Sequence, residues 1–181
     1  PSNYRHTRPT EILCTLRGSK TMVTRLRVQE WVLEYAIMRG VPNVVTKAVD
    51  SGNRTSLSLK YVRQMASSQI IVTVNPSEWE GDYRLWEAMG SGALVFVDPL
   101  FVPHPFPLID KEHVIYFNNH NRSELFEKLD YYRSHPDEAR RIALNGYFHA
   151  MKYHRTVNLI DYALRTAHTV SYTHLTLPTT P

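Results

Sequence analysis

Two hydrophobic patterns alternate along the chain: short apolar runs and longer amphipathic stretches. The short runs are rich in β-branched residues, which is typical of buried strands. They are EILCTLRGS ending at Gly18, VPNVVTKAV, QIIVTVN, ALVFV and HVIYF. The amphipathic stretches carry apolar residues at helical spacing and predict helices. They cover residues 21–39, 57–66, 82–90 and 156–168, the stretch from Leu125 to Tyr132, and a segment from about Pro136 to Tyr153.

Strands that alternate with helices favour a parallel sheet covered by helices on both faces. We therefore predict one α/β domain with a Rossmann-like sheet over residues 11–169, after an irregular lead-in at residues 1–10. In such sheets, ligands bind beyond the carboxyl ends of the strands. This edge, which we call the rim, is expected to carry the loops after residues 16, 48, 74 and 97.

Local signals mark the ends of several elements. Gly40 ends the first predicted helix, and DSGNRT is expected to be a turn. Asn121, followed three residues later by Glu124, is a plausible capping pair. Pro136 suits the first turn of the next helix.

One rim loop is rich in charge. The stretch NPSEWEGDYRLWEAMG places Glu78, Glu80 and Asp82 at the start of a predicted helix. Free amides at a helix start attract anions, and Gly81 lets a ligand approach the backbone closely. Alternatively, the three carboxylates only stabilise the helix, by about 0.3–1 kcal/mol each. The sequence leaves both interpretations open.

Glu87 has a different setting, because it lies inside the apolar run LWEAM. A partly buried carboxylate costs free energy unless it is paired or hydrogen-bonded. Arg84, one helical turn earlier, is one candidate partner. A ligand with a vicinal diol, such as a ribose, is the other, because a carboxylate can accept two hydrogen bonds from it.

The stretch RLWEAMGSGALVFVD resembles the donor-site signature of GT-B glycosyltransferases, and it is most similar to the spore-maturation-type, family-1-like group. The ending LNGYFHAMKYHRTVNLIDYAL is similar to the terminal helices of that group, so the resemblance spans about Leu57 to Arg165. It implies the carboxy-terminal, donor-binding domain of a two-domain enzyme. It also implies a nucleotide-sugar donor, no metal, and a catalytic base on a missing amino-terminal domain, so that this part alone would be inactive.

The resemblance also implies roles for individual residues. Glu87 would hold the ribose hydroxyls of the donor, while Gly81, Asp82 and Arg84 would face its diphosphate and sugar. Relatives often carry another Glu eight positions before the second one. That position is Trp79 here, with Glu78 and Glu80 on either side, so which of the two meets the sugar stays open. Basic residues after the first strand would neutralise phosphates, with surface solvation as the alternative; the candidates are Arg17, Lys20 and Arg25.

Composition narrows the other function classes. The formal net charge of the 181 residues is +4, but Lys and Arg are scattered without the interleaved aromatic residues of many nucleic-acid binders. No apolar run approaches the ~18 residues that a membrane span needs. We therefore expect neither a nucleic-acid partner nor a membrane span. The single cysteine, Cys14, sits in an apolar run and is expected to be buried.

Nine histidines raise the question of a metal site. None forms the i, i+4 pair that a helical zinc site uses, and His149 and His154 are five residues apart. His154 is interpreted as a helix-end residue. No metal or cofactor is expected beyond the nucleotide sugar itself.

The two ends of the chain carry their own signals. The chain begins with Pro1 rather than Met, and we interpret it as a piece of a longer chain whose compartment stays undetermined. Residues 170–181, VSYTHLTLPTTP, match an in-frame translation of a transposase-type sequencing adapter and are not expected to continue the preceding helix. The alternative is a native Thr-rich linker.

Three functions are compatible with these patterns. The first is a glycosyltransferase that transfers a hexose-type sugar to an unknown acceptor. The second is a catalytically silent nucleotide-sugar-binding module, and turnover that depends on an acceptor separates it from the enzyme. The third is a nucleotide-binding α/β module, which would show no preference for a nucleotide sugar over the nucleotide.

Overall fold

The computed structural model describes residues 8–16, 23–46, 52–53, 56–77 and 81–175. Its centre is a five-stranded sheet in which every pairing is parallel. In spatial order, the strands are β2 (Val44–Val45), β1 (Thr10–Leu13), β5 (Ser68–Val72), β6 (Leu94–Val97) and β7 (Ile115–Tyr116). The predicted parallel α/β fold is confirmed.

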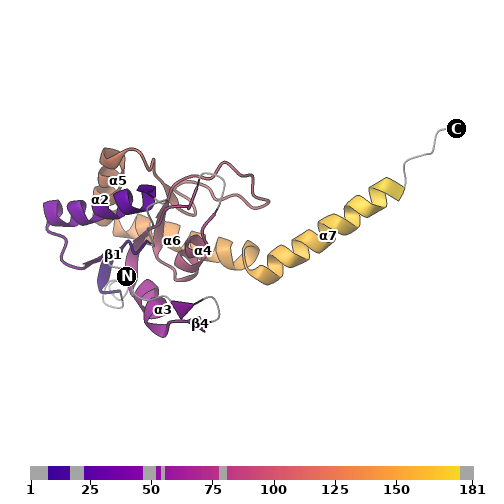
Figure 1. Cartoon of the computed structure of the whole chain (residues 1–181), viewed down its shortest axis with the longest axis horizontal. Helices are drawn as coiled ribbons and strands as arrows, with labels where there is room; N and C mark the ends of the chain where they lie inside the picture. The colour runs from indigo at the N-terminus through magenta and orange to yellow at the C-terminus, as the bar shows by residue number, and fades with distance from the viewer. Residues whose placement is uncertain (1–7, 17–22, 47–51, 54–55, 78–80, 176–181) are drawn as a thin grey trace.

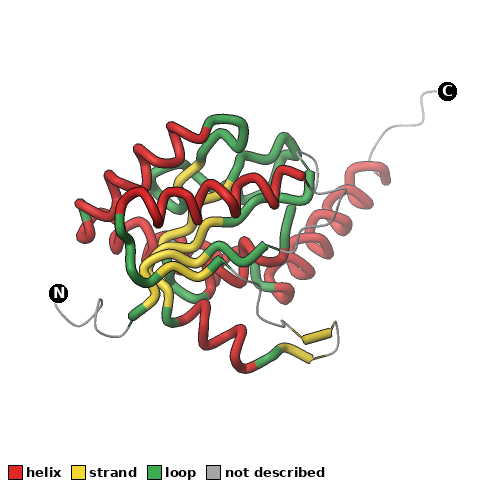
Figure 2. The backbone as a smooth tube through the Cα atoms, turned by 60° about the vertical axis from the view of Figure 1, so that its left-hand side comes forward, coloured by secondary structure: helices red, strands yellow, loops and turns green. Residues whose placement is uncertain are grey.

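Helices cover both faces of this sheet (Figures 1 and 2). Successive strand residues point to opposite faces, so Ile12 and Leu13 enter two different core clusters. One cluster also contains residues of α2 and α5, the other residues of α3 and α4, and α6 contributes to both. The helices are α2 (Val23–Arg39), α3 (Leu59–Ala66), α4 (Tyr83–Gly90), α5 (Arg122–Ser134), α6 (Pro136–Tyr153) and α7 (Thr156–Leu175).

Predicted helix ends are confirmed at three places. Gly40 follows α2 with a φ of +59°, a left-handed conformation that glycine adopts at little cost. The side chain of Asn121 accepts a hydrogen bond from the Glu124 amide at 3.2 Å. Pro136 is the first residue of α6.

The segments on either side of the predicted turn DSGNRT differ from expectation. Of the predicted strand VPNVVTKAV, only Val44–Val45 pairs in the described part of the chain. The turn contributes to a short antiparallel pair, β3 (Gly52–Asn53) and β4 (Ser56–Leu57). Leu57 therefore belongs to a strand, because its backbone pairs with Gly52 in this two-stranded sheet, and α3 begins two residues later.

The last helix also differs from the prediction. It continues to Leu175 instead of ending at His168, and no proline or glycine interrupts residues 156–175. It extends away from the body of the protein in Figure 1, and its apolar residues Leu159, Ile160 and Leu164 are exposed. The adapter origin of residues 170–181 stays a prediction. No helix among the described residues has the length and apolarity of a membrane span.

Candidate functional site

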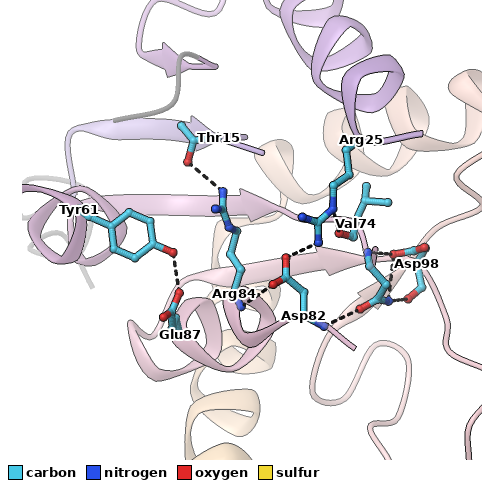
Figure 3. A network of polar contacts seen from close by, with 9 residues as sticks. Thr15, Arg25, Tyr61, Val74, Asp82, Arg84, Glu87 and Asp98 are labelled. Carbon is cyan, nitrogen blue, oxygen red and sulfur yellow. Dashed lines mark hydrogen bonds and ion pairs between the residues drawn. The ribbon is translucent and has the colours of Figure 1, made fainter. Parts of the chain in front are cut away.

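The start of α4 lies at the rim, where the chain leaves β5. Asp82 is the N-cap residue of α4, and its Oδ1 atom accepts a hydrogen bond from the Arg84 amide at 3.2 Å. Its Oδ2 atom lies 2.6 Å from the guanidinium of Arg25 on α2 (Figure 3). Asp82 therefore stabilises the helix, as one sequence interpretation proposed, and it also occupies an amide that the other interpretation left for an anion.

Arg25 is buried, although it was a candidate for binding phosphate. Besides the ion pair with Asp82, its Nε donates to the Val74 carbonyl oxygen at 3.1 Å. The side chains of the ion pair are only 7% and 17% exposed. The charge of Arg25 is thus compensated inside the protein, between α2 and the end of β5.

Three further polar residues extend this cluster, and sequence reasoning did not find them as a site. The Asp98 Oδ1 atom accepts hydrogen bonds from the Asn75 amide and side chain at 2.8 and 3.1 Å, and Oδ2 accepts from Asn119 at 2.9 Å. Burial raises the pKa of Asp98, while the hydrogen bonds from Asn75 and Asn119 lower it. The only local signal was that Asn75 and Asp98 each follow a buried strand. We call Arg25, Asp82, Asn75, Asp98 and Asn119 the Asp98 cluster.

Glu87 lies about one and a half helical turns after Asp82 on α4 and faces α3. Its Oε2 atom accepts a hydrogen bond of 2.6 Å from the hydroxyl of Tyr61 (Figure 3). No ion pair in the described part of the chain joins it to Arg84. The partner of Glu87 among the described residues is therefore Tyr61 and not the candidate Arg84. Tyr61 was missed because it reads as one more apolar residue of a helix face.

Arg84 extends from α4 between Glu87 and Asp82 toward the end of β1 (Figure 3). Its Nη1 lies 3.5 Å from the hydroxyl of Thr15, and its Cζ lies 5.8 Å from the centre of the Tyr61 ring. Its Nε is buried and has no hydrogen-bond partner within the described residues. The residue as a whole is half-buried, and a guanidinium carries five N–H donors, so it has donors left for an acceptor from a ligand. We call Tyr61, Glu87, Arg84 and Thr15 the Glu87 cluster.

The remaining predicted site residues are only partly described. Gly81 is exposed, and a Cβ atom there would lie 3.3 Å from the Leu100 side chain. Arg17, Lys20, Glu78 and Glu80 lie outside the described residues. Beside α4, a hollow of about 290 Å³ has Asn75 and Asp98 among its polar lining and the side chains of the 99–108 segment among its apolar lining.

His154 is the C-cap residue of α6, which confirms its interpretation as a helix-end residue. Its side chain lies between α4 and the 99–108 segment and contacts both. The imidazole stacks on Trp86 with ring centres 3.9 Å apart, and its Nε2 lies 2.9 Å from the Phe106 carbonyl oxygen. Burial lowers the pKa of His154 to about 4.

Neither a metal-binding group nor a reactive thiol is found in what the structure describes. Among these residues, no three His, Cys, Asp or Glu side chains are placed to hold a metal ion. Cys14 is fully buried as predicted, and burial raises the pKa of its thiol to about 12.

Several solved structures share this fold at low sequence identity. A GtfA/B complex matches with a TM-score of 0.62 at 14% identity, covering 90% of this chain and 36% of the other. The pneumococcal O-GlcNAc transferase GtfA in complex with UDP and GlcNAc matches with a TM-score of 0.57 at 13% identity. The match covers 90% of this chain and 36% of the transferase. Anabaena HepE in complex with UDP-glucose matches with a TM-score of 0.51 at 14% identity. The match covers 95% of this chain and 53% of HepE. The chain thus spans about a third to a half of these proteins. No curated protein matches.

These matches and the parallel sheet define the class: the fold is the Rossmann-like α/β fold of GT-B glycosyltransferases. A family model described as glycosyl transferase-like matches residues 15–165. The chain belongs to this glycosyl transferase-like family, and the predicted resemblance is confirmed at that level. The spore-maturation subgroup stays a prediction.

Proposed function

We propose that this chain forms the nucleotide-sugar donor site of a glycosyltransferase, with the Glu87 cluster as its centre. One observation carries the proposal. Arg84 and Glu87 lie side by side on a rim helix, and each has capacity for a ligand. Arg84 is half-buried and only the Nη1 of its guanidinium has a hydrogen-bond partner among the described residues, and one carboxylate oxygen of Glu87 accepts no hydrogen bond from them. The pneumococcal and Anabaena proteins, solved with UDP and with UDP-glucose, support a nucleotide of this kind.

The chemistry of the two side chains matches the two parts of a nucleoside diphosphate. Glu87 would accept hydrogen bonds from the ribose diol, and Arg84 would donate to the diphosphate near Thr15. A positive charge at that place stabilises the negative charge that develops on the leaving diphosphate as the glycosidic bond breaks. Arg84 would perform this work in place of a metal ion.

The Asp98 cluster would support this site without contacting the diphosphate. Asp82 fixes the start of α4 and thereby the positions of Arg84 and Glu87, while exposed Gly81 leaves the backbone open to the donor. Arg25 would act through Asp82. Roles for Glu78 or Glu80 at the transferred sugar, and for Arg17 and Lys20 at phosphates, stay predictions.

The remaining parts of the reaction belong to the proposal as well. We infer that a hexose-type sugar is transferred to an acceptor of unknown chemistry. The catalytic base would come from an amino-terminal domain outside these 181 residues, which cover 36% and 53% of two of the matched structures. The chain alone is therefore expected to bind donor but not to turn it over.

Titration calorimetry tests the donor site directly. The 181-residue chain is titrated with UDP, other nucleoside diphosphates and their sugar derivatives, in parallel with Glu87→Ala. We expect one diphosphate to bind and the substitution to weaken it about 10- to 100-fold, as loss of hydrogen bonds to a charged group does. Glu127→Ala, which removes an exposed carboxylate from α5, is the matched control.

Two results would contradict the proposal. Absence of binding by the folded chain would remove the donor site. Equal binding by the Glu87→Ala variant would remove Glu87 from it. If a diphosphate binds but no sugar derivative binds more tightly, the nucleotide-binding module becomes the better description.

A further inference from the structure

Tyr61 is a buried tyrosine whose hydroxyl meets the carboxylate at the centre of the site. It lies on the inner face of α3 with 5% of its surface exposed, and its hydroxyl is 2.6 Å from Glu87 Oε2. Burial, and then the hydrogen bond to Glu87, raise the pKa of Tyr61, so the hydroxyl remains protonated and donates. The bond joins α3 and α4, and its two residues are 26 positions apart in the sequence.

A buried tyrosine hydroxyl needs an acceptor, so this bond satisfies Tyr61 in any case. Glu87 does not need Tyr61 in the same way, because its side chain is only half-buried and can reach water. A carboxylate has about four acceptor positions, and the tyrosine uses one of them. The bond therefore restrains the carboxylate and leaves acceptor capacity for a diol.

The ring of Tyr61 also contacts the second charged group of the site. The Arg84 guanidinium lies over it, with Cζ 5.8 Å from the ring centre. One side chain of α3 thus contacts both Glu87 and Arg84, which are the groups assigned to ribose and diphosphate. A rigid ring held in the core fixes their separation before a ligand arrives, and such preorganisation lowers the entropy lost on binding.

We propose that Tyr61 is a positioning residue that orients the Glu87 carboxylate toward the ribose hydroxyls and thereby sets the preference for ribonucleotides over 2′-deoxynucleotides. The inference rests on the proposed function, and it gives a role to the residue of α3 in the Glu87 cluster, whose ligand contacts are assigned to Glu87 and Arg84 of α4. Tyr61 would act through the carboxylate that its hydroxyl contacts.

The test compares UDP with 2′-deoxy-UDP in titrations of the 181-residue chain and of Tyr61→Phe. In the unmodified chain, the missing 2′-hydroxyl should weaken binding about tenfold. In Tyr61→Phe, binding of UDP should weaken about three- to tenfold, while binding of 2′-deoxy-UDP changes less than about twofold. The ratio of the two affinities should therefore fall toward one.

Two further variants separate positioning from general stability. Tyr131→Phe removes the same kind of bond, a tyrosine hydroxyl donating to Glu138 Oε2 at 2.9 Å, between α5 and α6, and should leave the ratio unchanged. In the Glu87→Ala background, adding Tyr61→Phe should change UDP affinity less than about twofold, because no carboxylate remains to be positioned. Retained 2′-deoxy-UDP binding shows that each variant is folded.

Each other outcome contradicts either the role of Tyr61 or the donor site on which it depends. If the unmodified chain prefers UDP and Tyr61→Phe keeps that preference, Tyr61 has no positioning role, whereas the donor site stands. If Tyr61→Phe weakens both ligands equally, the tyrosine only supports the fold. If the unmodified chain binds the two ligands equally, the ribose contact of Glu87 is wrong and the role of Tyr61 falls with it. If it binds neither, the donor site itself is wrong.

Discussion

The Asp98 cluster and the Glu87 cluster lie on the same rim, and each contains a carboxylate at the start of or within α4. Asp82 and Glu87 are five residues apart in the sequence. Both oxygens of Asp82 accept hydrogen bonds from the protein, one from the Arg84 amide and one from Arg25. In Glu87, Oε2 accepts a bond from Tyr61, and Oε1 accepts none from the described residues.

The difference separates a structural cluster from a binding cluster. Every carboxylate oxygen of the Asp98 cluster has a partner in the protein, so the cluster has little left to offer a ligand. The Glu87 cluster keeps one carboxylate oxygen without a hydrogen bond from the described residues and a half-buried arginine of whose guanidinium only Nη1 has a partner among them. Substitutions in the first cluster should therefore change stability, and those in the second should change binding.

The largest expected effect is on stability and comes from Arg25→Ala. Removing the guanidinium leaves the Asp82 carboxylate, 17% exposed, without its ion-pair partner. Breaking a buried pair in this way typically costs about 3–5 kcal/mol of unfolding free energy. Urea denaturation followed by circular dichroism measures it.

The control for this variant is Arg165→Ala, which breaks the pair of Arg165 with Asp161, where the side chains are 78% and 59% exposed. It should change stability by less than about 0.5 kcal/mol. Equal effects of the two substitutions would show that the Asp82 pair is not protected from water.

The next effect is pH-dependent and concerns the support of α4 by His154. The folded pKa is about 4 and the ordinary value is 6.5, so the unfolded state binds more protons between these pH values. The contribution of neutral His154 to the unfolding free energy is complete above pH 6.5 and is lost as the pH falls to about 4. The loss amounts to at most about 3 kcal/mol. Unfolding free energies of the unmodified chain and His154→Phe, measured from pH 4 to 8, should converge on acidification. A constant difference would contradict the lowered pKa.

A smaller loss of stability is expected for Asn75→Ala. The side chain donates to Asp98 and accepts from the Asp82 amide, whereas the backbone amide of residue 75 would keep its bond to Asp98. Leaving buried acceptors with fewer donors costs about 1–3 kcal/mol. Thermal unfolding measures the loss. If binding of 2′-deoxy-UDP falls only in proportion to the folded fraction, Asn75 belongs to the structural cluster.

The smallest expected effect on stability is that of Glu87→Gln, and it sharpens the comparison most. The amide oxygen can still accept from Tyr61, and the side chain is half-buried, so unfolding free energy should change by less than about 0.5 kcal/mol. UDP binding should nevertheless weaken about tenfold, because the charge is lost. A large loss of stability with unchanged binding would reverse the roles of the two clusters.

Local sequence signals determined most of the helices and the strands of the parallel sheet, and their order. Short apolar runs such as QIIVTVN predicted the strands of the parallel sheet, and Asn121, Pro136 and Gly40 marked helix ends as found. The same signals placed Glu87 in a helix at the rim, and its surrounding motif led to the family. These features depend on residues within a few positions of one another, which is the range that propensity, capping and spacing describe.

The tertiary structure alone decided which charged residues are satisfied inside the protein. Tyr61 and Glu87 are 26 residues apart, Arg25 and Asp82 57, and Asn75 and Asp98 23. No periodicity records such pairs, because a hydrogen bond depends on distance and direction in space and not on spacing along the chain. Arg25 therefore resembled a phosphate ligand in the sequence and proved to be the partner of Asp82, while Tyr61 was hidden among the apolar residues of α3.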